Sequence, residues 1–149
     1  MCCGSKSYAQ RLGGKAMLFH TFASQEERRA FGGSDFMEFQ MCKLERGASL
    51  EKIMSIGDED MHHFKEDSLY LHGDDMNAFY AIYGEIFQGG YYANGECGPV
   101  DYCGINYYTL EQTMRIIEKL KKENPADSQI LLAWLSDAAE YNGLYLLGV

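Results

Sequence analysis

The most constraining pattern in the chain is the strict alternation in residues 36–44, FMEFQMCKL. Met37, Phe39 and Met41 fall on one side of an extended segment, while Glu38 and Gln40 fall on the other. A period of two residues is typical of a β-strand, because successive side chains of a strand point to opposite faces of the sheet. The pattern therefore predicts a strand with one apolar face and one face in water.

Further strand and helix patterns alternate along the chain, and they favour a sheet with helices packed on it. The other predicted strands cover residues 15–22, 68–72 and 144–149. The predicted helices cover residues 24–31, 49–56, 74–87, 109–124 and 127–142. The final strand is continuously apolar, which predicts a covered, central position in the sheet. The helix from Thr109 has a clear start signal, because Gln112 completes a capping box with the threonine.

The length of 149 residues fits one domain of ordinary size. Residues 1–14 contain no such pattern, and we expect them to form a flexible N-terminal tail. Residues 15–149 are then a single α+β domain. Its predicted architecture is a mixed β-sheet with helices packed on it, plus a Tyr/Gly-rich, hairpin-like insertion at residues 89–108.

That insertion reads GGYYANGECGPVDYCGINYY, with five Gly, five Tyr and two Cys among its twenty residues. Asn94-Gly95 predicts a type I′ hairpin turn, since both residue types tolerate a positive φ. Tyrosine offers a large amphipathic surface and is enriched at binding hot spots. A hairpin whose rings merely cover neighbouring helix ends is the alternative. The candidate partner- or ligand-binding residues are Tyr91, Tyr92, Asn94, Asp101, Tyr102, Asn106, Tyr107 and Tyr108.

Residues 58–75 are strongly acidic, with seven carboxylates against one lysine. A patch of this kind can steer a basic partner toward the protein, and a solvated connection is the plainer alternative. The candidate acidic docking patch comprises Asp58, Glu59, Asp60, Glu66 and Asp67. Carboxylates and histidines in this stretch could ligate a divalent metal, but neither H-E-x-x-H nor an EF-hand pattern is present.

Charge, apolar runs and cysteine content indicate which classes of protein the sequence favours and disfavours. The net charge of −9 disfavours nucleic-acid binding, which needs Lys and Arg against phosphates, and it is compatible with a basic protein partner. We find no apolar run of about 18 residues for a membrane helix and no secretory signal. The five cysteines are an odd number, which favours reduced thiols and a cytoplasmic location.

Motifs for cofactor, metal or covalent chemistry are missing from the sequence. Cys97 and Cys103 have five residues between them, outside the spacing of two to four that structural zinc sites use. No nucleotide-binding glycine motif and no G-x-S-x-G nucleophile elbow occurs. We therefore expect no cofactor and no metal, and we assign no catalytic residue.

These observations favour a small acidic cytoplasmic protein-interaction module of the inhibitor, immunity-protein or regulatory-adaptor kind. It would bind another protein through the Tyr-rich segment, with the acidic patch steering the encounter. The alternative is an enzyme or small-ligand-binding protein with a Tyr-lined pocket at residues 89–108, where Asp101 or a histidine would act as acid or base. A homodimer through an exposed aromatic face is also open.

Overall fold

The computed structural model describes residues 17–32, 35–56 and 64–148. The tail predicted for residues 1–14 lies outside this part of the chain. The described residues form one α+β domain in which helices pack on a seven-stranded sheet of order β1-β3-β2-β7-β6-β4-β5. The strands are β1 (Phe19–His20), β2 (Phe36–Met41), β3 (Leu69–His72), β4 (Gly90–Tyr91), β5 (Cys97–Gly98), β6 (Ile105–Tyr108) and β7 (Leu144–Leu147).

All neighbouring strands run antiparallel, so the prediction of a mixed sheet is wrong. A parallel pair would need a crossover that carries the chain back to the end of the sheet where the first strand began. The connection from β2 to β3 instead re-enters the sheet near the end where β2 leaves it, because Phe39 pairs with Leu69 and Phe36 with His72. The central position predicted for the last strand is confirmed, since β7 lies between β2 and β6.

The helices begin near the predicted capping residues. They are α2 (Gln25–Gly32), α3 (Leu50–Ile53), α5 (Met76–Tyr83), α6 (Leu110–Glu123) and α7 (Ser128–Trp134), with 3-10 turns η2 (Gly73–Asp75) and η3 (Leu135–Glu140). The capping box of α6 is confirmed: the Gln112 N–H donates to Thr109 Oγ1 over 3.1 Å, and the Thr109 N–H donates to Gln112 Oε1 over 2.8 Å. The helix predicted over 127–142 divides into α7 and η3.

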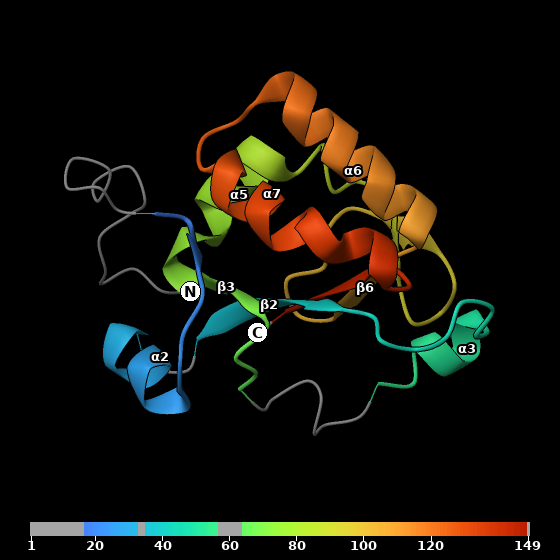
Figure 1. Cartoon of the computed structure of the whole chain (residues 1–149), viewed down its shortest axis with the longest axis horizontal. Coiled ribbons are helices and arrows are strands. Elements are labelled where there is room, and N and C mark those ends of the chain that lie inside the picture. The colour runs from blue at the N-terminus through green and yellow to red at the C-terminus, as the bar shows by residue number, and fades with distance from the viewer. Residues whose placement is uncertain (1–16, 33–34, 57–63, 149) are drawn as a thin grey trace.

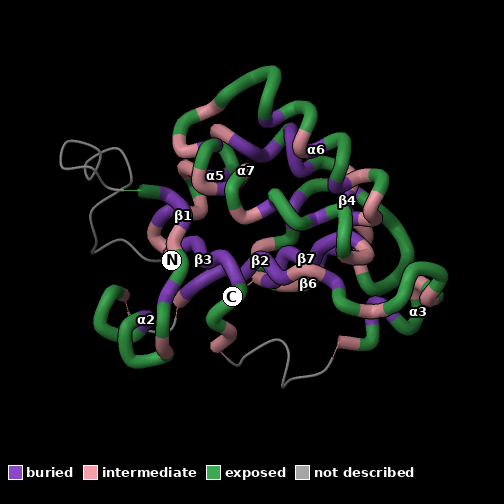
Figure 2. Tube along the Cα trace, in the orientation of Figure 1, coloured by how far each residue is buried: buried purple, intermediate pink, exposed green. Residues whose placement is uncertain are grey.

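Helices α5, α6 and α7 cover one face of the sheet, which we call the helix-covered face, while α2 and α3 lie on the opposite side near its two ends (Figure 1). The helix-covered face holds the main core. There the ring of Phe39 meets the rings of Phe19, Phe79 and Phe87 edge-on, each at a centroid distance of 5.8 Å. The buried trace follows β3, β2 and β7 through the middle of the molecule (Figure 2).

The opposite surface of the sheet, the outer face, is not wet as the alternation of β2 predicts. Glu38 is 4% exposed and Gln40 is 7% exposed. The Arg28 guanidinium of α2 lies 5.8 Å from the Phe36 ring centroid and 5.1 Å from that of Tyr70, on this same face. Short segments therefore fold over a surface that the sequence pattern assigns to solvent.

Two glycines with positive φ differ in how tightly the chain is packed around them, and the more crowded one directly precedes β7. Gly143 has φ +86°, and a Cβ there would lie 2.1 Å from the Tyr108 carbonyl oxygen. Gly95 has φ +88° with nothing within 4 Å of the corresponding position. Gly95→Ala should cost roughly 1 kcal/mol in unfolding free energy, the conformational strain alone. Gly143→Ala should cost at least about 2 kcal/mol more, because backbone must also move.

Urea denaturation of the two variants and the wild type measures both costs under one set of conditions. Equal losses in the two alanine variants would contradict the close approach of β6 to the start of β7.

Candidate functional site

The Tyr-rich segment forms the predicted hairpin, but with a different turn. β4 and β5 pair through Gly90 with Gly98 and Tyr91 with Cys97. The loop closes through a bond of 2.9 Å from the Gly95 N–H to the Tyr92 carbonyl. Gly95 has a positive φ, whereas Asn94 does not, so the type I′ prediction is wrong. The Asn94 side chain instead accepts the Glu96 N–H over 2.9 Å, within a three-residue loop closed by a left-handed glycine.

Three of the eight predicted binding residues are buried. Asn106, Tyr107 and Tyr108 are 0%, 2% and 1% exposed, because β6 lies inside the sheet between β7 and β4. The Tyr108 hydroxyl donates to the Phe87 carbonyl over 2.7 Å, and the Tyr107 hydroxyl donates to the Asn142 carbonyl over 2.5 Å. Burial raises the pKa of Tyr107 to about 12. These side chains support the fold, and the expectation that they face a partner does not fit their burial.

The other five residues, Tyr91, Tyr92, Asn94, Asp101 and Tyr102, reach the surface at least in part. Two of them are committed to local contacts: the Tyr92 hydroxyl donates to the Pro99 carbonyl over 2.5 Å, and Asp101 Oδ1 accepts the Cys103 N–H over 3.0 Å. Tyr102 meets the ring of Tyr80 from α5 edge-on at 5.9 Å. The segment therefore contributes an aromatic surface beside α5.

The candidate acidic docking patch lies only partly within the described residues. Asp58, Glu59 and Asp60 lie outside the described residues. Glu66 and Asp67 are exposed, but Asp67 is engaged: its Oδ2 lies 2.5 Å from Lys43 Nζ, and its backbone carbonyl accepts the Trp134 indole N–H over 3.0 Å. The bond from Lys43 to Asp67 raises the pKa of the lysine.

A cavity of about 380 Å³ opens on the outer face, between α3 and the turn at residues 64–68. We call it the outer-face pocket. Its volume lies in the range of small-molecule sites. Its described lining consists of Gln40, Met41, Lys43, Leu44, Lys52, Ile53, Ser55, Ile56, Lys65, Asp67, Ser68 and Tyr145.

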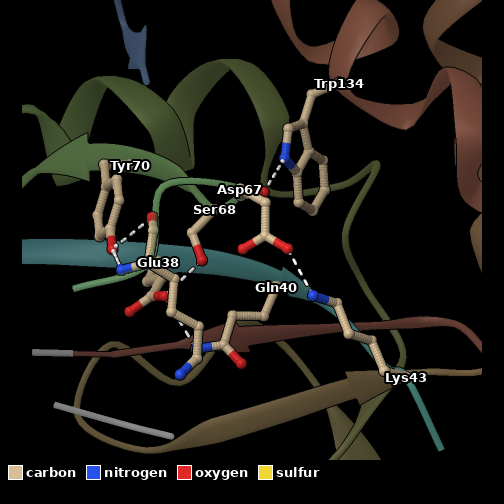
Figure 3. Close-up of polar contacts among 8 residues, drawn as sticks. Glu38, Gln40, Lys43, Asp67, Ser68, Tyr70 and Trp134 are labelled. Atoms are coloured by element: carbon tan, nitrogen blue, oxygen red, sulfur yellow. Dashed lines mark hydrogen bonds and ion pairs between the residues drawn. The ribbon is translucent and has the colours of Figure 1, made fainter. Parts of the chain in front are cut away.

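A buried carboxyl group lies directly behind this lining. Glu38 Oε2 accepts hydrogen bonds from the Gln40 amide over 2.8 Å and from the Ser68 hydroxyl over 2.6 Å (Figure 3). Burial raises the pKa of Glu38, against the opposing effect of these two donors and of the charges of Lys65 and Arg28. An ionisable group that burial makes easier to protonate thus lies behind the lining of the pocket, held by two of its lining residues.

The turn at residues 64–68 is one wall of the pocket, and several bonds fix it to the sheet. The Tyr70 hydroxyl accepts the Lys65 N–H over 2.9 Å, and burial raises the pKa of Tyr70 to about 12. The Trp134 indole and the Lys43 side chain both hold Asp67 (Figure 3). The position of the Lys65 backbone is therefore set by β3, and that of Asp67 by Lys43, just after β2, together with α7.

Helix α3 is the opposite wall. Ser49 Oγ accepts the Lys52 N–H over 3.2 Å at the helix start, as the sequence predicts for a capping serine. The Tyr145 hydroxyl, from β7, donates to the Ile53 carbonyl over 2.7 Å and fixes the end of the helix to the sheet. Lys52 belongs to this wall, and its Nζ lies 3.5 Å from Oε1 of Glu45 in an exposed ion pair.

A second cavity, of about 390 Å³, is lined by residues of α5, the segment that follows it and the end of α6: Tyr80, Ala81, Ile82, Gly84, Glu85, Ile86, Gln88 and Glu123. Neither this cavity nor the outer-face pocket takes lining residues from 89–108, so neither is the Tyr-lined pocket expected from the sequence. In the second cavity, both ionisable acids are exposed. The outer-face pocket is the stronger candidate site because it lies against a buried carboxyl.

Sequence reasoning missed the outer-face pocket, because Glu38 and Gln40 were assigned to solvent. Comparison of the chain with protein-family models, curated proteins and solved structures gave no match. Among the described residues, no three His, Cys, Asp or Glu side chains gather closely enough to hold a metal ion. None of the described helices has the length and apolar character needed to cross a membrane.

The buried position of Glu38 predicts how stability changes with pH. A raised pKa in the folded state means that the folded protein holds the proton more tightly than the unfolded chain. Ionisation above 4.5, the ordinary value of the group, therefore costs folding free energy. The free energy of unfolding of the wild type should fall relative to that of Glu38→Gln as pH rises through this value, by at most about 1.4 kcal/mol per pH unit.

Chemical denaturation of both proteins from roughly pH 4 to pH 8 measures this difference. Glu118→Gln on α6 is the matched control, because its side chain is exposed and should leave the pH dependence of the wild type in place. A Glu38→Gln difference that stays constant with pH would contradict the assignment.

Proposed function

We propose that the protein binds a small organic molecule in the outer-face pocket. One observation carries this proposal: Gln40 and Ser68 line the cavity and also hold the buried carboxyl group of Glu38 behind it. Burying an ionisable group costs free energy, and apolar residues of similar size would stabilise a sheet at least as well. Ionisable groups with shifted pKa values in concave sites are typical of ligand-binding and catalytic centres.

The described lining favours binding over covalent turnover. It contains neither His nor Cys. The Ser68 hydroxyl is directed to Glu38, and Ser68 is 1% exposed, so it is poorly placed as a nucleophile. Apolar side chains from β2, α3 and the residues that follow them surround the polar base of the cavity. An apolar lining with a few fixed polar groups is the usual composition of a small-molecule site.

The proposal predicts a specific effect of filling the cavity. Ser55 lines the pocket and is exposed, so Ser55→Trp should place an indole in the opening without disturbing the core. Small fragments screened by NMR should shift backbone signals of β2, α3 and the 64–68 turn in the wild type. The variant should bind those fragments at least about tenfold more weakly, a cost of roughly 1.4 kcal/mol.

Ser136→Trp, on the exposed side of η3, is the matched control and should bind the fragments as the wild type does. Fragments that bind Ser55→Trp as tightly as the wild type would contradict the location of the site.

A second function, recognition of another protein, has its own structural support. Tyr80 is 53% exposed and contacts Tyr102 edge-on, which brings the Tyr-rich segment and α5 together at the surface. The Tyr102 hydroxyl is buried without a hydrogen-bond partner in the described part of the chain. An unsatisfied buried hydroxyl is costly, and a partner that supplied an acceptor on rearrangement would remove that cost. Exposed tyrosines are common anchors of protein interfaces.

This second function predicts that Tyr80→Ser abolishes capture of a partner that the wild type retains on a column, since truncating an aromatic anchor costs roughly 2 kcal/mol or more. Met114→Ser on α6 removes another exposed apolar side chain, 39% exposed, and should leave capture intact. Equal capture by the wild type and Tyr80→Ser would exclude Tyr80 as the anchor.

A further inference from the structure

The charges around the outer-face pocket identify the class of its ligand. We propose that this ligand is an organic anion, a carboxylate or phosphate group joined to an apolar group, which Lys52 and Lys43 bind at the opening. This inference rests on the proposed function, because it specifies the ligand of the same cavity.

The cavity concentrates positive charge in an acidic protein. Three lysines line it, Lys43 from the segment after β2, Lys52 from α3 and Lys65 from the 64–68 turn, while Asp67 is the one acid in the described lining. The whole chain has a net charge of −9. Three separate segments thus bring cations to one opening, against the average charge of the surface. Lysine ammonium groups are common ligands of carboxylate and phosphate.

The present partners of two of these lysines are easily replaced. In the ion pair of Lys43 with Asp67, the side chains are 61% and 56% exposed, and in that of Lys52 with Glu45 they are 57% and 75% exposed. Ion pairs at such exposure contribute little net free energy, because water screens them. A ligand anion can therefore share or replace these carboxylates without breaking the fold.

The rest of the cavity suits an apolar group and not a second charge. Met41, Leu44, Ile53 and Ile56 line it. For a cationic ligand, the one acid of the described lining, Asp67, already pairs with Lys43. Glu38, behind the lining, already accepts two hydrogen bonds at Oε2, and the charges of Lys65 and Arg28 act on it. The apolar lining and the lysines together favour an amphipathic anion.

Three probes with the same hydrocarbon chain test the charge of the ligand: hexanoate, hexyl phosphate and neutral hexanamide. Each is titrated into the full chain at neutral pH, and binding is followed by NMR shifts of the pocket residues. At least one anion should bind about fivefold or more tightly than hexanamide, as expected for one charge-assisted contact. The tighter of the two anions tells whether the site prefers carboxylate or phosphate.

Lysine variants test which side chains contact the anionic group of the ligand. Lys52→Gln should weaken the anions by about fivefold and leave hexanamide unchanged. Lys43→Gln is the second variant, which should act in the same direction, and Lys119→Gln on the exposed side of α6 is the control that should change nothing. Loss of binding in the control would show that general charge, and not this opening, attracts the anion, and would overturn the inference.

The outcomes separate the two proposals. Hexanamide that binds the pocket as tightly as both anions would overturn the inference about charge and leave the binding site in place. Probes that shift no pocket residue, or that shift only residues around Tyr80 and Tyr102, would overturn the site itself.

Discussion

The structure depends on the burial of β2 from both sides. On the helix-covered face, Phe39 joins an aromatic core with residues of β1 and α5. On the outer face, the same strand presents Glu38 and Gln40 beneath Arg28 and the 64–68 turn. Polar side chains that lose contact with water must be satisfied within the protein. The hydrogen bonds from Ser68 and Gln40 to Glu38 meet that requirement, and they also determine the base of the outer-face pocket.

Local signals in the sequence predicted local structure well. The Thr109–Gln112 capping box, the presence of a hairpin around Gly95 and the buried last strand were predicted correctly, because each depends on residues close in sequence or on uniform apolarity. The turn type of that hairpin was not. The direction of the strands was not predicted correctly, since it depends on where each connection returns to the sheet.

The pocket could not be predicted for a related reason. Alternation in β2 looks the same whether its polar face meets water or is covered by segments such as α2 and the 64–68 turn. The composition of residues 89–108 did not predict which of its tyrosines are buried. Tyr107 and Tyr108 belong to a strand inside the sheet, while Tyr102 lies in the preceding loop. That difference arises from strand order, which no local pattern encodes.

The outer-face pocket and the aromatic surface at Tyr80 lie on opposite sides of the sheet, since α3 and α5 pack on different faces (Figure 1).

The buried carboxyl group behind the outer-face pocket can be tested directly by a carbon-13 NMR titration of the Glu38 side chain in the folded protein. The burial of Glu38, against the opposing effect of Ser68 and Gln40, predicts a pKa above 4.5. A pKa at or below this value would show that burial does not dominate the environment of Glu38, and would contradict the cost of burial from which the site is argued.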